Sequence, residues 1–347
     1  MKVQEKYIKR CIELAKNGLG TTYPNPLVGC IIVNENKIIG EGWHKKSGQA
    51  HAEVIAIESV QNKKLLSSST LYVSLEPCSH FGKTPPCADL ILKYKIPNVV
   101  IGTIDPNSKV AGKGIQKLKD DGVNVTFGIL EKECNELNKR FFTFHKKSRP
   151  FIILKWAESS DGFISPKNKD EQKPVWISNE YSRQLVHKWR SEEQAILVGT
   201  QTIIDDNPSL TVRDWTGDNP IRVINDKENR IETSKNVFDN QAKTIVFSNK
   251  EVTAVADQIE YIKVDFDKNP EQAIVKKLYE NNIQSIIIEG GRKTIQSFID
   301  ANLWDEARVF IGEIKLHEGT KAPELNKAIY SKMYLKKDTL LTYRNDN

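Results

Sequence analysis

The hydrophobic and polar positions of the chain predict helices alternating with strands. Residues 3–16 carry apolar side chains at helical spacing, and the apolar run 28–33 leads through a polar turn into a second strand. The next expected elements are helices over 51–60 and 87–95 and strands over 71–76 and 98–105. Alternation of this kind is typical of a layered α/β domain.

A second α/β pattern begins at residue 151. Its short apolar runs, each suited to a strand, are 151–157, 195–199, 221–226, 244–248 and 285–289, and a helix is expected over 178–190. The basic segment 137–150, which ends in a proline, separates the two patterns, and no repeat relates the halves. We therefore expect two domains, residues 1–147 and 148–347, each of ordinary domain size.

Composition narrows the class of protein without deciding its function. The 347 residues are 39% hydrophobic and 28% charged, which excludes a disordered or low-complexity chain. There is no apolar run long enough to span a membrane and no apolar core of a secretory signal near the first residue. Five cysteines are too few for a disulfide framework and favour cytoplasmic thiols or metal ligands. The net charge of +6 is spread along the chain, so it suits a small anionic substrate as well as a polynucleotide.

The strongest chemical signal is His51-Ala-Glu53 followed by Pro77-Cys78 and then Cys87. One imidazole and two thiolates suit a catalytic zinc ion, which keeps its fourth position for water. Glu53 is then a candidate to carry protons without binding the metal. Because residues two apart do not share a face in mid-helix, we expect His51 and Glu53 at a helix start. Cys78 and Cys87 both follow prolines and are likewise expected at helix starts.

These residues match the zinc-deaminase signature H-x-E…P-C-x-x-C, except that eight residues, SHFGKTPP, separate the cysteines. With that longer segment the chain resembles the bifunctional deaminase–reductase family of the riboflavin pathway, whose deaminase half carries HAE and EPCSHxGxTPPC. Three further family motifs are present, PNPLVG at 24–29, GEGWH at 40–44 and DPNSKVAGKG at 105–114. The resemblance implies a cytidine-deaminase-like three-layer α/β domain that binds Zn²⁺ through His51, Cys78 and Cys87, with Glu53 catalytic.

The resemblance also implies a deaminase substrate pocket lined by Asn25, His44, His80 and Lys83. A flat aminopyrimidine needs amide donors and acceptors, which Asn25 supplies. A phosphate needs cations or helix N-termini, for which His80, Lys83 and the turn 112–114 are candidates. The alternatives are that Asn25 only stabilises its proline-rich loop and that Lys83 is solvated.

The second half lacks G-x-G-x-x-G, so a Rossmann dinucleotide site is not predicted. The segment 285–291 reads as a strand ending in Gly-Gly before a helix, a shape that lets backbone N–H groups approach a phosphate but equally serves turn geometry alone. The family resemblance continues in LKWAESSDG at 154–162, WIS at 176–178, TIIDDNPSLTVR at 202–213 and EGG at 289–291.

For this half the resemblance implies a dihydrofolate-reductase-like α/β fold that uses NADPH, with WIS on a strand. The implied cofactor contacts are Ala157, Trp176, Thr202, Asp206 and Gly291. The implied contacts with the sugar phosphate are Lys155, Arg190, Leu210, Arg213 and Glu289. Ser160, Pro174 and Lys227 depart from the family's usual Leu, Ser and Ser, so the contacts around those loops stay open.

The leading hypothesis is zinc-dependent deamination of 2,5-diamino-6-ribosylamino-4(3H)-pyrimidinone 5′-phosphate, followed by NADPH-dependent reduction of its ribosyl group to ribityl. It implies a small phosphorylated pyrimidine as partner, no nucleic acid, no membrane and a homo-oligomer. One alternative is a nucleic-acid base deaminase with a binding module, against which stand the long Cys–Cys segment and the absence of a basic stripe. The other is a structural zinc clip, whose fourth ligand would have to be Cys11, Cys30 or Cys134, all in apolar patterns.

Overall fold

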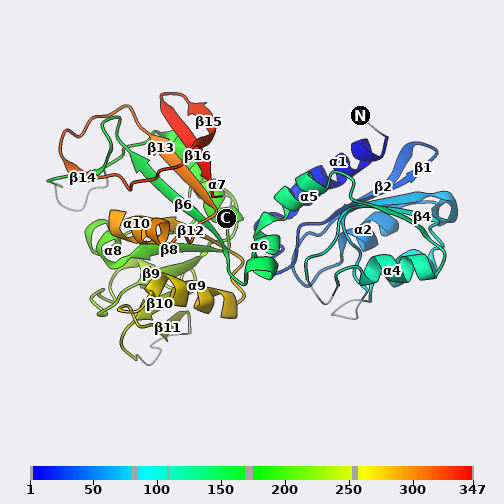
Figure 1. The fold of residues 1–347 in the computed structure, drawn as a ribbon, viewed down its shortest axis with the longest axis horizontal. Coiled ribbons are helices and arrows are strands. Elements are labelled where there is room, and N and C mark those ends of the chain that lie inside the picture. Colours follow the sequence, from blue (N-terminus) through cyan, green and yellow to red (C-terminus); the bar gives the residue numbers. More distant parts are fainter. Residues whose placement is uncertain (1–2, 80–84, 108–109, 169–174, 252–256, 346–347) are drawn as a thin grey trace. The chain divides into compact units, whose positions relative to one another are not determined.

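A computed structural model describes residues 3–79, 85–107, 110–168, 175–251 and 257–345. The chain divides into two compact units, which we call the N-terminal unit (Met1–Lys147) and the C-terminal unit (Ser148–Asn347). Figure 1 follows both units by colour, from blue at the N-terminus to red at the C-terminus. Each unit has its own sheet and its own hydrophobic core.

The N-terminal unit is built on a five-stranded sheet of order β2-β1-β3-β4-β5. Its strands are β1 (Gly29–Asn34), β2 (Lys37–Trp43), β3 (Thr70–Leu75), β4 (Asn98–Thr103) and β5 (Asn124–Phe127). β1 runs antiparallel to both β2 and β3, whereas β3, β4 and β5 are parallel. Glu35 and Asn36 both have positive φ, which is the backbone of a tight two-residue hairpin turn, as the sequence predicts.

Helices cover both faces of this sheet. They are α1 (Val3–Ala15), α2 (Ala52–Ser59), α3 (Cys87–Lys93), α4 (Lys113–Asp120), α5 (Glu131–Leu137) and α6 (Lys139–Lys147), with short 3₁₀ turns at Lys16–Gly18 and Lys63–Ser68. Alternate residues of β1 face opposite layers, because Cys30 and Ile32 pack with α2, α3 and α4, whereas Ile31 and Val33 pack with α1 and α5. The unit is therefore a three-layer α/β sandwich.

The C-terminal unit has a nine-stranded sheet of order β11-β10-β9-β8-β12-β6-β13-β16-β15. Its strands are β6 (Phe151–Glu158), β8 (Ala195–Gly199), β9 (Ile221–Asn225), β10 (Thr244–Ser248), β11 (Ile259–Lys263), β12 (Ser285–Glu289), β13 (Glu306–Ile311), β15 (Ile329–Leu335) and β16 (Asp338–Arg344). The strands from β11 to β13 are parallel, and β16 and β15 are antiparallel additions. β7 (Phe163–Pro166) and β14 (Gly319–Lys321) form a separate pair.

The helices of this unit also lie on both faces of the sheet. They are α7 (Glu180–Glu192), α8 (Thr200–Asp206), α9 (Pro270–Glu280) and α10 (Arg292–Asp300), with a 3₁₀ turn at Asn236–Phe238. Trp189 of α7 packs with Ile153 and Phe310 on one face, and Phe298 of α10 packs with Ile288 on the other. Short apolar strands buried on both faces are typical of such a parallel sheet.

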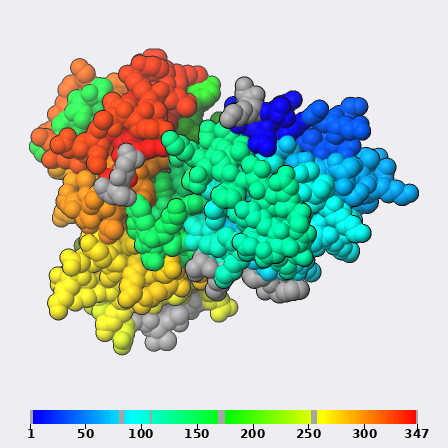
Figure 2. Space-filling model, turned by 45° about the vertical axis from the view of Figure 1, so that its right-hand side comes forward, coloured from blue at the N-terminus to red at the C-terminus, as the bar shows by residue number. Residues whose placement is uncertain are grey.

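β15 forms an edge of the nine-stranded sheet and keeps four large side chains exposed, Ile329, Tyr330, Met333 and Tyr334. Figure 2 shows the red C-terminal segment, which includes this strand, on the surface of the molecule. In the described part of the chain, every helix is too short or too polar to cross a lipid bilayer.

One predicted strand is wrong. The segment 176–178 was expected to be a strand, but it has no strand pairing and ends at Asn179, the N-cap of α7. Side-chain bonds hold it instead, because Asn179 N donates to Asp338 Oδ2 (2.7 Å) and its Nδ2 donates to the Leu335 carbonyl (2.7 Å). The segment 176–179 is thus held by hydrogen bonds to the β15–β16 turn instead of by backbone pairing with a strand.

Candidate active sites of the two units

His51 and Glu53 lie together at the start of α2, as their spacing requires. His51 is the N-cap residue with extended backbone (φ −72°, ψ 164°), and its carbonyl accepts the first helical bond from Ile55. Glu53 lies in the first turn and is buried, at 3% exposure. Because the chain changes direction at the N-cap, the two side chains converge although they are only two residues apart.

Cys87 is the first residue of α3, as predicted, whereas the prediction of a helix start at Cys78 is wrong. Cys78 lies in the irregular loop after β3, and the Cys78 carbonyl accepts a bond from the Ala88 N–H (3.1 Å). A preceding proline suits an extended loop as well as a helix start, and here the bond to α3 holds the loop extended. The start of α3 therefore supplies Cys87 and also holds Cys78.

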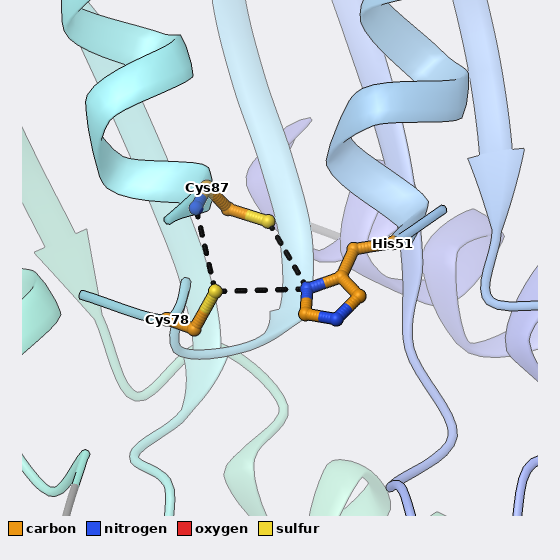
Figure 3. A group of neighbouring side chains, drawn as sticks. All are labelled: His51, Cys78 and Cys87. Carbon is orange, nitrogen blue, oxygen red and sulfur yellow. Dashed lines mark hydrogen bonds between the residues drawn. The ribbon is translucent and has the colours of Figure 1, made fainter. Parts of the chain in front are cut away.

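The three candidate ligands meet in one cluster (Figure 3). His51 Nδ1 lies 3.3 Å from Cys87 Sγ and 3.6 Å from Cys78 Sγ, and the three ligand atoms all lie within 4.8 Å of one another. Zinc bonds of about 2.0 Å to nitrogen and 2.3 Å to sulfur in a tetrahedron separate those atoms by roughly 3.6 Å. The residues present therefore fit a tetrahedral zinc ion bound by three protein ligands.

The surroundings of the cluster favour a thiolate at Cys78. The hydrogen bond with Cys87 lowers the pKa of Cys78, and the bond with His51 acts in the same direction, although burial opposes both. The Cys87 backbone N–H, at the N-terminus of α3, also donates to Cys78 Sγ (3.3 Å). Burial raises the pKa of Glu53 to about 6. A buried carboxyl beside a thiolate is suited to hold a proton.

Within the described ranges, His51, Cys78 and Cys87 are the one group of three or more His, Cys, Asp or Glu residues able to hold a metal. Cys11, Cys30 and Cys134 are buried in the core and do not belong to this group. A three-ligand site with one coordination position left open is typical of catalytic zinc, whereas structural zinc has four protein ligands.

Asn25 and His44 form a hydrogen-bonded pair near the cluster. His44 Nδ1 lies 3.1 Å from the Ala50 carbonyl, which can only accept, so Nδ1 carries the proton. Nε2 is then an acceptor and receives the bond from Asn25 Nδ2 (3.0 Å). Burial lowers the pKa of His44, which favours this neutral tautomer. The pair fixes the amide of Asn25 with Oδ1 turned away from His44. The other two predicted pocket residues, His80 and Lys83, lie outside the described residues.

The turn 112–114 is not a phosphate cradle, contrary to the sequence prediction. The carboxylate of Glu76 accepts bonds from the backbone N–H groups of Gly112 (2.9 Å) and Gly114 (2.9 Å), and the Lys113 N–H bonds the Val110 carbonyl. An internal anion therefore already uses the donors that a phosphate would need.

In the C-terminal unit, three of the predicted substrate contacts form a buried ionic cluster. Arg190 of α7 pairs with Glu289 at the end of β12, with Nη2 2.9 Å from Oε2. Lys155 of β6 lies beside the same carboxylate, with Nζ 3.7 Å from Oε2. Burial acts to raise the pKa of Glu289, but the charges of Arg190 and Lys155 outweigh it and hold the pKa at about 2. Burial also lowers the pKa of Lys155.

The loop that carries the remaining two substrate candidates contacts this cluster. Arg190 Nη1 donates to the Thr211 carbonyl (3.3 Å), and the neighbouring Leu210 is buried with a φ of 56°. The Arg213 N–H donates to His187 Nδ1 (3.1 Å), while its side chain is exposed. Sequence reasoning missed His187, which lies one turn before Arg190 on the same face of α7.

Two of the predicted cofactor contacts lie side by side. Gly290 and Gly291 have positive φ, and a Cβ on Gly291 would lie 3.4 Å from Thr202 Oγ1. Ala157 is half-buried on β6, Asp206 is exposed at the end of α8, and Trp176 is 56% exposed with the guanidinium carbon of Arg183 5.0 Å from its ring centre. The structure thus joins Thr202 to the Gly-Gly turn, whereas Trp176 lies in the irregular segment that precedes α7.

Two of the three departures from the family pattern can be described. Ser160 Oγ bonds the Ile314 carbonyl (3.1 Å), and Lys227 forms an exposed ion pair with Asp267 (2.7 Å). Both residues therefore have local structural partners. Pro174 lies outside the described residues.

The comparisons with known proteins agree with a zinc-binding deaminase domain in the N-terminal unit and a reductase domain in the C-terminal unit. Residues 1–103 match the cytidine and deoxycytidylate deaminase zinc-binding region, and residues 150–323 match the RibD C-terminal domain. The fold and the site thus define a two-domain enzyme, a zinc-binding deaminase of cytidine-deaminase-like fold joined to a reductase of dihydrofolate-reductase-like fold.

The similarity to bifunctional relatives extends over nearly the whole chain. The riboflavin biosynthesis protein RibD of Aquifex aeolicus is 40% identical over 93% of this chain and 90% of its own length. The solved structure of a diaminohydroxyphosphoribosylaminopyrimidine deaminase/5-amino-6-(5-phosphoribosylamino)uracil reductase from Thermotoga maritima has a TM-score of 0.90 and 37% identity, covering 99% of this chain and 98% of that one. RibD of Acinetobacter baumannii has a TM-score of 0.89 and 31% identity, covering 99% of each chain. The chain belongs to the RibD family of bifunctional riboflavin biosynthesis deaminase–reductases.

Proposed function

We propose that the N-terminal unit hydrolyses the ring 2-amino group of 2,5-diamino-6-ribosylamino-4(3H)-pyrimidinone 5′-phosphate and that the C-terminal unit reduces the ribosyl group of the product with NADPH. The observation that carries the first half is the meeting of His51, Cys78 and Cys87 beside the buried carboxyl of Glu53. The names of the Thermotoga maritima relative support the same two substrates.

In the deaminase site, His51, Cys78 and Cys87 would hold zinc, and Glu53 would move the protons. Zinc, when bound, lowers the pKa of a water molecule and so supplies a nucleophile near neutral pH. Glu53 would take a proton from the attacking water and deliver it to the departing amino group, so that a carbon–oxygen bond replaces the carbon–nitrogen bond and the amino group leaves as ammonia. Its burial keeps bulk water from competing for that proton.

Asn25 would orient the pyrimidine ring. The bond to His44 uses the amide nitrogen of Asn25, so Oδ1 is left to accept a bond from an N–H of the substrate. His44 therefore acts on the substrate through Asn25 as well as by lining the pocket. His80 and Lys83 remain predictions for the same pocket.

In the reductase site, the cations around Glu289 would bind the sugar phosphate. Arg190 and Lys155 share the single carboxylate of Glu289, so the cluster keeps an excess positive charge that can attract an anion. Arg213 lies on the loop that Arg190 contacts and adds a further cation. NADPH, when bound, supplies the hydride. Thr202 and the Gly290–Gly291 turn would approach its phosphates, and Ala157, Trp176 and Asp206 stay predicted contacts.

Two further proposals concern the setting of the enzyme. We propose a homo-oligomer, which the exposed aromatic side chains of the edge strand β15 support, and sedimentation of the purified chain would measure it. All five cysteines are free thiols, which supports a cytoplasmic location.

The deaminase proposal is tested with Glu53→Gln. We expect ammonia release to fall at least about 100-fold, because proton transfer is lost, while zinc content stays near one ion per chain. Reduction of separately supplied 5-amino-6-(5-phosphoribosylamino)uracil by NADPH should be unchanged.

The matched control for this experiment is Glu58→Gln, which removes an exposed carboxylate from the same helix. It should leave both reactions unchanged. Ammonia release by Glu53→Gln at the rate of the unmodified enzyme would refute the assigned proton transfer.

A further inference from the structure

Glu76 is a buried carboxylate whose hydrogen-bond partners are backbone amides. It is 4% exposed and stands two residues before Cys78. Oε1 accepts from the N–H groups of Gly114 (2.9 Å) and Ile115 (3.2 Å), and Oε2 accepts from those of Gly112 (2.9 Å) and Asp105 (3.3 Å). The carboxylate thus joins the loop after β4 and the first turn of α4 to the loop that carries Cys78.

The amides of α4 form a favourable site for a negative charge. The first N–H groups of a helix have no helical partner, and their dipoles point toward an anion at the N-terminus. A carboxylate that accepts several N–H bonds is held more firmly than a neutral side chain, because each bond is charge-assisted. The side chain of Glu76 therefore has one position, set by the helix.

Gly114 brings the same helix into contact with the backbone between Glu76 and Cys78. A Cβ on Gly114 would lie 2.0 Å from the Pro77 carbonyl oxygen, which is far below van der Waals contact. Only glycine allows α4 to approach Pro77 so closely. Cys78 is thus fixed from two sides, by α4 through Glu76 and Pro77 and by α3 through the Ala88 N–H.

We propose that Glu76 is a positioning residue of the deaminase, which sets the distance of Cys78 from Cys87 and His51 and so the affinity for zinc. The proposal rests on the zinc site of the proposed function. Glu76 does not touch the ligand atoms. It acts by tying the Cys78 loop to the start of α4, just as Cys87 is held in place as the first residue of α3.

The first test is Glu76→Gln in the full-length chain. The amide keeps the size of the side chain, but its NH₂ group faces N–H donors that need an acceptor. We expect zinc affinity to fall 10- to 100-fold, the range typical of groups outside the ligand shell, measured as competition for Zn²⁺ against a chromophoric chelator. Reductase turnover should be unchanged, which shows that the C-terminal unit is intact, and the unfolding temperature of the zinc-free protein reports on the fold of the N-terminal unit.

Two controls separate positioning from general stability. Glu41→Gln removes a different ion pair of the same unit, the one with Arg10, and should leave zinc affinity unchanged. Gly114→Ala keeps Glu76 and raises helix propensity, yet it displaces Pro77, so we expect it to weaken zinc binding as well. Gly114→Ala decides the question if Glu76→Gln does not fold.

The outcomes are distinguishable. Weaker zinc binding in both variants, with the unfolding temperature of the zinc-free protein nearly unchanged, supports the proposal. A lower unfolding temperature with unaltered zinc affinity would mean that Glu76 only stabilises the fold, and the proposal would be wrong. If the unmodified chain itself binds no zinc, it is the proposed function that fails.

Discussion

Three buried glutamates show how the neighbours of a carboxyl group determine its role. Glu53 is buried without a strong cationic partner, and because burial disfavours the charged form its pKa rises to about 6. Glu289 is buried beside Arg190 and Lys155, and its pKa falls to about 2. Glu76 faces backbone amides and fixes a loop. The first is suited to move a proton, the second to orient cations, and the third to hold the chain in place.

His187 gives the C-terminal unit a predictable dependence on pH. Burial, together with the charges of Arg190 and Arg213, lowers the pKa of His187 to about 4, although the charges of Asp214 and Glu289 oppose this shift. The unfolded chain takes up this proton near pH 6.5 and the folded chain only near about 4. Protonation therefore favours unfolding between these values, and stability falls as the pH decreases through that window.

The variant His187→Gln should show a smaller loss of stability over the same pH window. Tryptophan fluorescence measures it, because five of the six tryptophans belong to this unit, namely Trp156, Trp176, Trp189, Trp215 and Trp304. The comparison is the fall in unfolding temperature from pH 7 to about pH 4 in the two proteins. An equal fall in both would contradict the assignment to His187.

At the scale of elements, the loop that carries Asn25 depends on a contact far away in the sequence. Asn138, between α5 and α6, accepts a bond from the Leu27 N–H (2.8 Å) and donates to the Leu27 carbonyl (2.8 Å). The side-chain amide thus pairs with the loop as a neighbouring strand would. The Asn138 amide and the Leu27 N–H and carbonyl groups are all buried. Loss of the amide therefore leaves the two Leu27 backbone groups without these hydrogen bonds.

We expect Asn138→Ala to destabilise the N-terminal unit by about 2 kcal/mol, because buried backbone groups lose their bonds. The KM for the deaminase substrate should rise, since Asn25 lies two residues from Leu27. Urea unfolding and steady-state ammonia release measure the two effects. Asn124→Ala, which breaks an exposed bond with Asn98 in the same unit, should change neither.

The sequence predicted those parts of the site that are local in the chain. His51 and Glu53 form a three-residue motif at a helix start, and Cys87 begins a helix after two prolines. The partners of Glu76 and Asn138 could not be predicted, because they are 29 to 111 residues away and no periodicity connects them. The glycine turn at 112–114 was misassigned for the same reason, since the anion that it binds is Glu76, in the loop after β3.

The elements show the same division. Strands with uninterrupted apolar runs, such as β8 and β12, were predicted. β13 was not predicted although it is buried, because Glu306 and Arg308 interrupt its run. β15 was not predicted, because its side chains are exposed on both faces and carry no alternation. A hydrophobic pattern indicates which side chains are buried, and an exposed edge strand lacks such a pattern because few of its side chains are buried.

At the scale of the whole molecule, the two units hold separate chemistry. The candidate zinc ligands all belong to the N-terminal unit, and the ionic cluster around Glu289 belongs to the C-terminal unit. Removal of zinc with a chelator should therefore stop ammonia release. NADPH oxidation with supplied 5-amino-6-(5-phosphoribosylamino)uracil should continue at the same rate.

Added zinc should then restore ammonia release, provided that the thiols are kept reduced. Following ammonia and NADPH in parallel on one sample provides the measurement. Loss of both activities on chelation would contradict the assignment of one reaction to each unit.

The position of β16 in the sheet has a consequence for the order of folding during synthesis. β16 follows every other strand in the chain, yet it lies between β13 and β15, so the nine-stranded sheet is completed only after residue 344 has left the ribosome. The N-terminal unit has its own sheet and core within residues 1–147, so it can fold while the other unit is still being made. A nascent chain could therefore already carry its metal before the second enzyme exists.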